Sequence, residues 1–416
     1  MFFIRTLATI LFLGIHVFAW TQSNDSRKWI KDLASPELFG RGYVNHGDSL
    51  AAEYIAAEMK NLGALPVLNS YFQPFQFGVN TFPDTIELKM DGKTLIPGTD
   101  YIVDPNCPSV NATYKIKFYD PAHWENALTR HSSDEILVFS SKGITDKDSL
   151  KRYQEILKSC SEKYPVIRLQ NKLTWSVGRK VSDVVKLDML ASSFPENAEM
   201  LHVKINNRFI PKYSTRNVWS IVPAKKKSDK YILITAHYDH LGMMGTQACF
   251  YGANDNASGI AQLLSLLKGI VKNPLKKFNV IFVAFAGEEA GLLGSSYMAD
   301  HCPVDLKKIR FLFNLDLQGT GEEGATIVNA TLHEKEFKLL TNLNKKTKSL
   351  VQIKPRGTAA NSDHYPFSQK GVPAFFMYTM GGSKAYHDIN DQADQLSLFA
   401  FDGITKLVDT FLRKLK

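Results

Sequence analysis

Three apolar runs decide the fold of this chain: YILITA (231–236), NVIFVAFA (279–286) and IRFLFNL (309–315). Runs of this length and composition are typical of strands that are buried on both faces. The first two are each followed by a segment with helical spacing of its apolar residues, SGIAQLLSLLKGI (258–270) and GLLGSSYMAD (291–300). Alternating strands and helices predict an α/β fold, a mainly parallel sheet sandwiched by helices.

Acidic side chains and histidines stand where these strands end. A further expected strand, AFFMYT (374–379), is followed by a Gly-Gly turn and then a histidine, and the loop before the 258–270 helix carries an acid. In open sheets of this kind, ligands bind at the carboxyl ends of the strands. The side chains that the pattern places there are His237, Asp239, Asp255, Glu288, Glu289, Asp316 and His387.

These residue types suit a metal site. Charges that follow apolar strands are costly to bury unless they share a cleft and are neutralised. Two histidines and several carboxylates on one edge indicate divalent cations, and mixed nitrogen and oxygen ligation suits zinc. Asp239 follows His237 by two residues, on one face of an extended segment, so its carboxylate is expected to orient the imidazole. Taken singly, a histidine can be a core residue, Glu288–Glu289 a solvated turn and Asp255 a helix cap.

The composition is that of an ordinary globular protein. The 416 residues are 44% hydrophobic and 22% charged, with a formal net charge of +9. This excludes a disordered chain, and the length favours two domains or one domain with an insertion. The basic residues are dispersed and the lysine clusters at 225–227 and 345–346 are short, so no nucleic-acid partner is expected.

The first residues have the pattern of a secretory signal. One positive charge in residues 1–5 precedes the apolar stretch LATILFLGIHVFA (7–19), which ends in small residues that suit signal peptidase. We expect a signal peptide over 1–19, a secreted or periplasmic protein and no membrane span in the mature chain; a short membrane anchor is the alternative. Disulfides are permitted in such a compartment, and the pairing stays open for Cys107, Cys160, Cys249 and Cys302.

The mature chain divides into three parts. Residues 26–75 look helical, with a helix capped at 48–49 and ended by Gly63, and are expected to form the N-terminal part of the catalytic domain. Residues 76–205 contain short alternating runs separated by turn residues, which predicts a small inserted β-rich domain without a catalytic cluster. Residues 206–416 are expected to form the catalytic domain.

Six ordered segments give the most specific signal: HYDHLG (237–242), GANDNASG (252–259), GEEAGLLGS (287–295), NLDLQG (314–319), SDHYPF (362–367) and YHDINDQ (386–392). Together they resemble the dizinc aminopeptidases, whose superfamily includes plasma glutamate carboxypeptidase, glutamate carboxypeptidase II, glutaminyl cyclase and the transferrin receptor. The likeness is strong over 215–400 and weaker over 26–75, where LASPELFGRG matches. The 76–205 insert sits where several relatives carry a protease-associated domain. The resemblance implies the zinc exopeptidase fold.

The resemblance also implies the metal content and its ligands. It implies two Zn²⁺ per chain, with Asp255 bridging the two ions. His237 and Asp316 would complete the protein ligands of one ion, and Glu289 and His387 those of the other. In relatives the peptide bond that follows the bridging aspartate is often cis, so a cis bond is expected here as well.

Two more carboxylates receive roles from the resemblance. Glu288 would act as the general base, and Asp239 would support the ligand His237. The expected activity is that of an aminopeptidase, which hydrolyses the N-terminal bond of a peptide or aminoacyl small-molecule substrate through a water shared by two zinc ions. The alternatives are a carboxypeptidase or dipeptidase of the same mechanism, a single-zinc glutaminyl cyclase and a non-catalytic receptor-like protein. The oligomeric state and the preferred residue stay open.

One stretch departs from the family pattern. Some relatives place a tyrosine just before the SDH motif to stabilise the oxyanion, whereas residues 357–361 read GTAAN here. Tyr365, Tyr378 and Tyr386 are candidates to replace it, and zinc alone is the remaining possibility.

Overall fold

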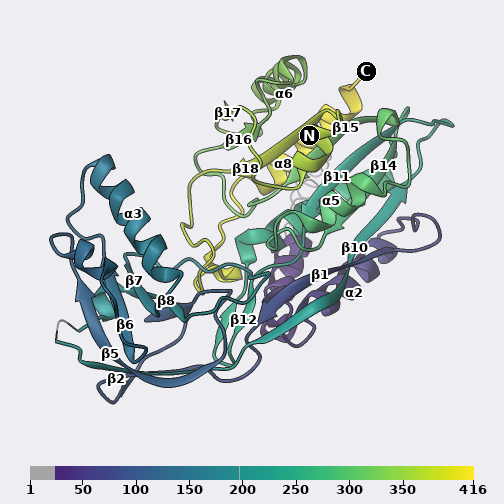
Figure 1. The fold of residues 1–416 in the computed structure, drawn as a ribbon. Helices are drawn as coiled ribbons and strands as arrows, with labels where there is room; N and C mark the ends of the chain where they lie inside the picture. Colours follow the sequence, from purple (N-terminus) through teal and green to yellow (C-terminus); the bar gives the residue numbers. More distant parts are fainter. Residues whose placement is uncertain (1–23, 196) are drawn as a thin grey trace, which may run out of the picture.

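The computed structural model describes residues 24–195 and 197–416, which form two eight-stranded sheets and a two-stranded hairpin. The expected signal peptide over 1–19 lies outside these residues. The first sheet contains strands that come before the second sheet in the sequence and strands that come after it. The chain therefore leaves the first sheet once and later returns to it. Figure 1 shows the second sheet with its helix α3 beside the first sheet, which carries the other labelled helices.

The first sheet has the predicted mainly parallel centre. Its strand order is β1 (Phe72–Thr81), β10 (Arg208–Val222), β14 (Asn279–Phe285), β11 (Tyr231–His237), β15 (Ile309–Leu315), β18 (Ala374–Thr379), β16 (Ala325–Val328) and β17 (Ile353–Pro355). The four strands from β14 to β18 run parallel to one another. On either side, β10 and β16 pair antiparallel to them. The carboxyl ends of β14, β11 and β15 therefore meet at one edge.

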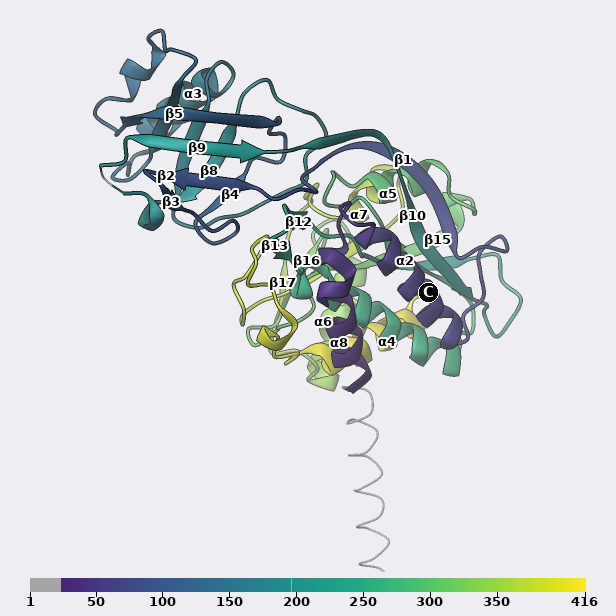
Figure 2. The same cartoon turned by 90° about the horizontal axis from the view of Figure 1, so that it is seen from below.

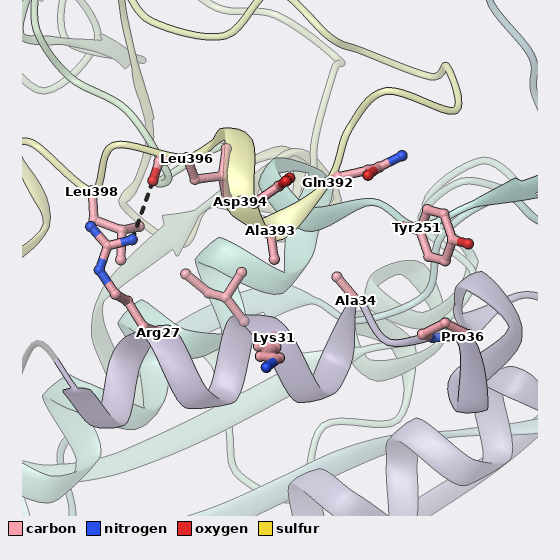
Figure 3. Close-up of a pocket in the computed structure, with 11 residues that line it drawn as sticks. Arg27, Lys31, Ala34, Pro36, Tyr251, Gln392, Ala393, Asp394, Leu396 and Leu398 are labelled. Carbon is pink, nitrogen blue, oxygen red and sulfur yellow. Dashed lines mark hydrogen bonds between the residues drawn. The ribbon is translucent and has the colours of Figure 1, made fainter.

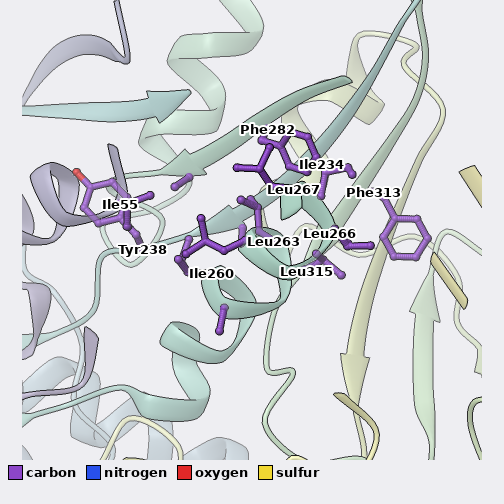
Figure 4. Close-up of a cluster of buried hydrophobic side chains, with 14 of the residues drawn as sticks. Ile55, Ile234, Tyr238, Ile260, Leu263, Leu266, Leu267, Phe282, Phe313 and Leu315 are labelled. Atoms are coloured by element: carbon purple, nitrogen blue, oxygen red, sulfur yellow. The ribbon is translucent and has the colours of Figure 1, made fainter. Parts of the chain in front are cut away.

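Side chains alternate between two cores along the central strands. On β11, Ile232 and Ile234 contribute to the larger core, whereas Leu233 between them contributes to the opposite one. Figure 4 shows Ile55 and Ile260 of two covering helices on the larger core with Ile234. The helices on that face are α2 (Gly47–Asn61), α4 (Gly259–Lys272) and α8 (Phe401–Lys414), with α6 (Glu334–Thr347) packed on α8. The opposite face is covered by α5 (Leu293–Asp300) and α7 (His364–Gln369).

The second sheet lies wholly between β1 and β10. Its order is β3 (Lys93–Thr94), β2 (Glu87–Met90), β9 (Met200–Ile205), β5 (Val110–Tyr119), β6 (Glu135–Ser140), β7 (Val166–Gln170), β8 (Lys186–Leu190) and β4 (Tyr101–Val103). The strands expected from the alternating runs are present, whereas α3 (Lys147–Ser161) was not expected. In Figure 2 this sheet stands to one side of the first, and the long strands β1 and β10 lead to it. We call the stretch between them the 82–207 segment.

The connections are short helical turns and one hairpin. They comprise β12 (Gly242–Met244), β13 (Ala248–Phe250), η1 (Pro36–Arg41), η2 (Trp124–Leu128), η3 (Ala191–Ser193), η4 (Ala253–Ser258), η5 (Leu306–Lys308) and η6 (Ala393–Gln395). Residues 24–33 are also helical. Within the described residues, no helix has the length and apolarity needed to cross a membrane.

Local details differ from the sequence expectations in two places. The helix expected to be capped at 48–49 instead begins at Gly47, preceded by His46 in the left-handed region, because Asp48 is buried and its carboxylate accepts hydrogen bonds from two side chains of β10. Gly63 follows the end of this helix with φ 91°, as the sequence predicted. The four cysteines, whose pairing was open, are all free.

Candidate metal centre

All seven predicted site residues meet at one edge of the first sheet. His237 ends β11, Glu288 and Glu289 follow β14, and Asp316 follows β15. Asp255 lies in the turn η4 that leads into α4, and the Asp255–Asn256 peptide bond is cis as expected. A cavity of about 250 Å³ opens on this cluster, and its wall includes His237, Asp255, Glu288, Asp316 and His387.

Asp255 lies between two sets of donor atoms. Its Oδ1 is 3.3 Å from Nε2 of His237, which in turn is 3.4 Å from Oδ1 of Asp316. Its Oδ2 is 3.2 Å from Nε2 of His387, which is also 3.2 Å from Oε2 of Glu289. One carboxylate therefore presents a different oxygen to each of two histidine–carboxylate pairs.

These separations fit zinc. Ligand atoms that lie 2.0–2.1 Å from a tetrahedral zinc stand about 3.3–3.4 Å apart, close to the observed values. Oδ1 of Asp316 is buried and makes no hydrogen bond to any described residue. Ligand atoms of His237, Glu288 and Asp316, and likewise of His237, Asp255 and Glu289, all lie within 4.8 Å of one another. The donor set is thus the nitrogen and oxygen mixture that zinc accepts.

Backbone carbonyls orient both histidine rings. Nδ1 of His237 is 3.2 Å from the carbonyl oxygen of Asp239, and Nδ1 of His387 is 2.9 Å from that of Trp175. A carbonyl can only accept, so Nδ1 of each ring donates the proton and Nε2 keeps its lone pair for the site. Each imidazole is therefore in the tautomer that a metal ligand requires.

The carboxylate of Asp239 acts on a different partner from the one expected. Its Oδ1 is 3.9 Å from Nδ1 of His237, too far for a hydrogen bond. Instead it accepts hydrogen bonds from the backbone N–H groups of Glu288 (3.1 Å) and Glu289 (3.3 Å), and from the Tyr43 hydroxyl (2.9 Å). β11 ends at His237, so residue 239 does not continue the extended geometry that would place its carboxylate beside the ring.

The two adjacent glutamates are in contrasting electrostatic surroundings. Burial raises the pKa of Glu288 well above its usual range; His237 counters this, while Glu289 and other nearby carboxylates reinforce it. Burial also acts to raise the pKa of Glu289, but His387 and further partners outweigh it and hold that pKa at about 2. Glu288 therefore suits proton uptake, and Glu289 suits permanent ionisation.

A buried arginine fixes the loops that carry the site. Arg41 is fully buried, and burial lowers its pKa to about 10 although nearby aspartates counter this. Its guanidinium donates to the carbonyl oxygens of Tyr238 (2.7 Å), Leu33 (2.8 Å), Tyr251 (2.7 Å) and Gly252 (2.7 Å). Tyr238 follows one proposed ligand and Gly252 begins the loop of another. Sequence reasoning missed this role, although Arg41 stood in the quoted LASPELFGRG stretch.

Two further acid–base residues were missed. Nδ1 of His240 lies 2.8 Å from Oε1 of Glu289, the oxygen that does not face His387. The carboxylate of Asp391 accepts hydrogen bonds from the backbone N–H groups of Asn254 (2.8 Å) and Asp255 (2.9 Å). Both residues lie in the quoted segments HYDHLG and YHDINDQ, so the signal was present but had no role attached.

The 82–207 segment reaches the metal-site loop. Besides the carbonyl that holds the His387 ring, the N–H of Trp175 donates to the His387 carbonyl oxygen at 2.9 Å. The Lys172 ammonium forms an ion pair with Asp388 at 2.9 Å and donates to the carbonyl oxygen of Lys384 at 3.0 Å. A segment in which we expected no catalytic cluster therefore contributes backbone contacts to the site.

The structure separates the three candidate tyrosines. Tyr378 and Tyr386 line the cavity, whereas Tyr365 does not. The ring of Tyr386 stacks on that of His387 with centroids 4.0 Å apart and an interplanar angle of 14°. Burial raises the pKa of the Tyr386 hydroxyl, and the site carboxylates Asp255 and Glu289 reinforce the shift.

A larger cavity, of about 500 Å³, lies away from this cluster. It lies between the helix at 24–33 and the 392–398 loop, and Figure 3 shows Arg27 of the helix donating to the Leu396 carbonyl oxygen of the loop. Its wall contains one carboxylate, no histidine and no cysteine. It therefore lacks a donor set for zinc, and the smaller cavity is the better candidate for catalysis despite its size.

Residues 217–412, which span this site, match the sequence profile of peptidase family M28. This match covers slightly less than half of the chain. The chain is similar to aminopeptidase YwaD of Bacillus subtilis, at 32% identity over 153 residues, 36% of this chain and 32% of that protein. It is also similar to a probable leucine aminopeptidase of Arthroderma otae, at 28% identity over 213 residues, 49% of this chain and 58% of the relative. The chain thus spans about a third to three fifths of these relatives.

Solved structures establish the fold over nearly the whole chain. The zinc aminopeptidase BSAP from Bacillus subtilis superposes with a TM-score of 0.69 at 20% identity, covering 94% of each chain. An aminopeptidase from Aneurinibacillus sp. strain AM-1 gives a TM-score of 0.64 at 20% identity, covering 94% of this chain and 93% of the other. Because these matches cover nearly the whole chain, the predicted α/β fold class is confirmed.

Proposed function

We propose that this chain is a zinc-dependent aminopeptidase that holds two zinc ions. The observation that carries the proposal is the placement of Asp255, whose two oxygens face two separate histidine–carboxylate pairs. His237 and Asp316 would hold one ion, Glu289 and His387 the other, and Asp255 would bridge them. The names of the M28 relatives support zinc and aminopeptidase chemistry.

The chain's own residues supply the proton transfers. Two bound zinc ions would supply Lewis-acid activation of the attacking water and of the scissile carbonyl. Glu288 lines the same cavity as the proposed ligands, so it would take a proton from the water and return it to the departing amine. Asp239 holds the backbone of Glu288 in place. The Tyr386 hydroxyl, on the cavity wall, is our candidate donor to the oxyanion.

An exopeptidase also has to recognise a chain end. The free α-amine of a substrate is cationic, and it would be attracted to the carboxylates around the cavity. A carboxypeptidase or dipeptidase is the second candidate, since the same cavity contains the cation Arg356. A glutaminyl cyclase needs only one zinc ion, so the second donor pair around His387 disfavours this alternative. A receptor-like protein would need neither the complete set of ligands nor the base.

We also propose an organisation and a location for the chain. A signal peptide over 1–19, supported by its apolar pattern, would direct the protein to the periplasm or the exterior. Residues 76–205 would form an inserted domain, and residues 206–416, with 26–75, the catalytic domain. The separate core within the 82–207 segment supports an inserted unit, since most of its apolar side chains pack against one another.

The experiment compares wild type with Glu288→Gln. Purified wild type should contain close to two zinc ions per chain by elemental analysis and should hydrolyse aminoacyl anilides but not their N-acetylated forms. Glu288→Gln should keep the zinc and lower kcat by about 10²–10⁴-fold, since the general base is lost.

The matched control is Glu334→Gln, which removes a carboxylate at the start of α6, away from the cavity. It should leave kcat unchanged. Near-normal turnover in Glu288→Gln would remove that residue from the mechanism. Zinc-loaded protein that cleaves N-acetylated peptides as fast as free ones would instead exclude an aminopeptidase.

A further inference from the structure

One wall of the catalytic cavity carries a cation that the proposed chemistry does not use. Arg356 follows β17, in the stretch that leads to the SDH motif, and it lines the cavity together with Asn361. Among the residues that the structure describes on this wall, it is the only arginine or lysine. The side chain is exposed, so a ligand that enters the cavity can reach it.

The guanidinium of Arg356 has spare hydrogen-bonding capacity. Its Nη1 donates to the hydroxyl oxygen of Tyr378 at 3.2 Å. Within residues 24–195 and 197–416, no carboxylate, including Glu323 on the wall of a neighbouring cavity, forms an ion pair with the Arg356 guanidinium. Arginine presents five N–H donors in a planar fork that matches a carboxylate. The fork is held by one tyrosine and keeps donors available.

The rest of the wall suits a small substrate. Leu317 and Phe376 give the cavity apolar surface, and the volume of about 250 Å³ lies below the range of pockets for drug-sized ligands. A second cavity of about 490 Å³ shares Leu317, Tyr378 and Tyr386 with it, so a longer chain would have an exit beside Tyr378. Arg356 therefore lines the same small cavity as the proposed metal ligands, and a substrate held there can reach its guanidinium.

We propose that Arg356 binds a carboxylate of the substrate and makes this site selective for substrates that carry an acid close to the scissile bond. The inference rests on the proposed peptidase function and deepens it. Two sources share this chemistry: the side chain of an N-terminal aspartate or glutamate, and the terminal carboxylate of a dipeptide. Either would form a paired, charge-assisted contact with the guanidinium.

The test compares Arg356→Met with wild type on four substrates: glutamyl anilide, leucyl anilide, the dipeptide Leu-Ala and its C-terminal amide. Loss of the contact between Arg356 and the substrate carboxylate should lower kcat/KM for acid-bearing substrates by about 10- to 100-fold, chiefly by raising KM. A hydrogen bond to a charged group typically contributes an affinity factor of about this size. Leucyl anilide and the amide should change less than about twofold. Arg356→Lys, which keeps charge but loses the fork, should fall in between.

The arms separate the two sources. A selective loss on glutamyl anilide assigns the contact to the N-terminal side chain, and a selective loss on Leu-Ala assigns it to the terminal carboxylate. The matched control is Lys354→Met, which removes one exposed charge from the preceding strand without touching the cavity, and it should behave as wild type. Equal effects on all four substrates, or none, would overturn the proposal.

A binding measurement keeps this inference separate from the peptidase proposal. Zinc-loaded Glu288→Gln and the double variant Glu288→Gln/Arg356→Met are titrated calorimetrically with glutamate and with Leu-Ala. At least one ligand should bind about 10-fold or more weakly to the double variant. If both ligands bind equally well to Glu288→Gln and to the double variant, Arg356 has no role in binding, whatever the activity of the wild type. If the two variants differ in binding but the wild type hydrolyses no substrate, only the proposed peptidase function is refuted.

Discussion

Replacing Arg41 by lysine tests whether the site depends on a guanidinium that touches no proposed ligand side chain. Arg41 makes four hydrogen bonds of 2.7–2.8 Å to buried or half-buried carbonyl oxygens on separate stretches of chain. A lysine ammonium has three donors on one atom and cannot span the same positions. At least one or two of these carbonyls would therefore lose their partner.

The size of the effect follows from the burial of those carbonyls. Each unsatisfied buried group costs about 1–3 kcal/mol, so Arg41→Lys should lower the free energy of unfolding by about 2–4 kcal/mol. The same loss frees the carbonyls of Tyr238 and Gly252, which flank His237 and Asp255 in sequence. Groups that support metal ligands typically contribute 10–100-fold in metal affinity, and we expect a weakening in that range.

Urea unfolding followed by tryptophan fluorescence, with zinc competition against a chromogenic chelator, measures both quantities. The matched control is Arg27→Lys, because Arg27 also donates to two backbone carbonyls, of Leu396 and Ser397, but partly at the surface. It should change stability by less than about 0.5 kcal/mol. If Arg41→Lys behaves like this control in both assays, the buried fork has no part in holding the site.

Other consequences of the structure can be measured. His387→Ala should reduce the zinc content from about two ions per chain to about one, by elemental analysis; unchanged zinc would count against that ligand. Lys172→Met loses a half-exposed ion pair with Asp388, so zinc affinity in the competition assay should drop by up to about fivefold; a rise would contradict the contact's role. Burial lowers the pKa of His364 from 6.5 to about 4. Between these pH values the unfolded chain binds the proton more tightly than the folded one, so the free energy of unfolding should fall by about 3 kcal/mol as the pH drops from 6.5 to 4 and should not depend on His364 above pH 6.5. Urea unfolding of zinc-free protein should show this slope, and an equal slope in His364→Phe would refute it.

The catalytic edge was predictable because it depends on a simple rule of sheet geometry. Acids and histidines that directly follow buried parallel strands must meet, and His237, Glu289 and Asp316 do so at the ends of β11, β14 and β15. Asp255 was found from its loop before α4. For these residues, the local pattern and the topology point to the same place.

The supporting contacts were not predictable, for physical reasons. The Trp175 carbonyl that orients His387 is a backbone atom, so no side-chain pattern marks it. Arg41 acts across about 200 residues of sequence on carbonyls, which every residue possesses. The Asp239 carboxylate lies 3.9 Å from Nδ1 of His237 because the strand ends two residues earlier than its alternation implied. Sequence spacing identifies side chains on regular elements, whereas these contacts depend on irregular backbone.

The return of the chain to the first sheet has a consequence for how the protein acquires its structure. Thr81 pairs with Arg208 where β1 and β10 begin to diverge, and joining the ends of a loop of roughly 130 residues costs about 4 kcal/mol in chain entropy. If the 82–207 segment collapses onto its own core first, its two ends are brought together beforehand and most of that cost is already met. The pairing of β1 with β10 at the outer edge of the first sheet would then form last. A destabilising substitution in the core of the 82–207 segment should therefore slow the formation of the metal site in the first sheet.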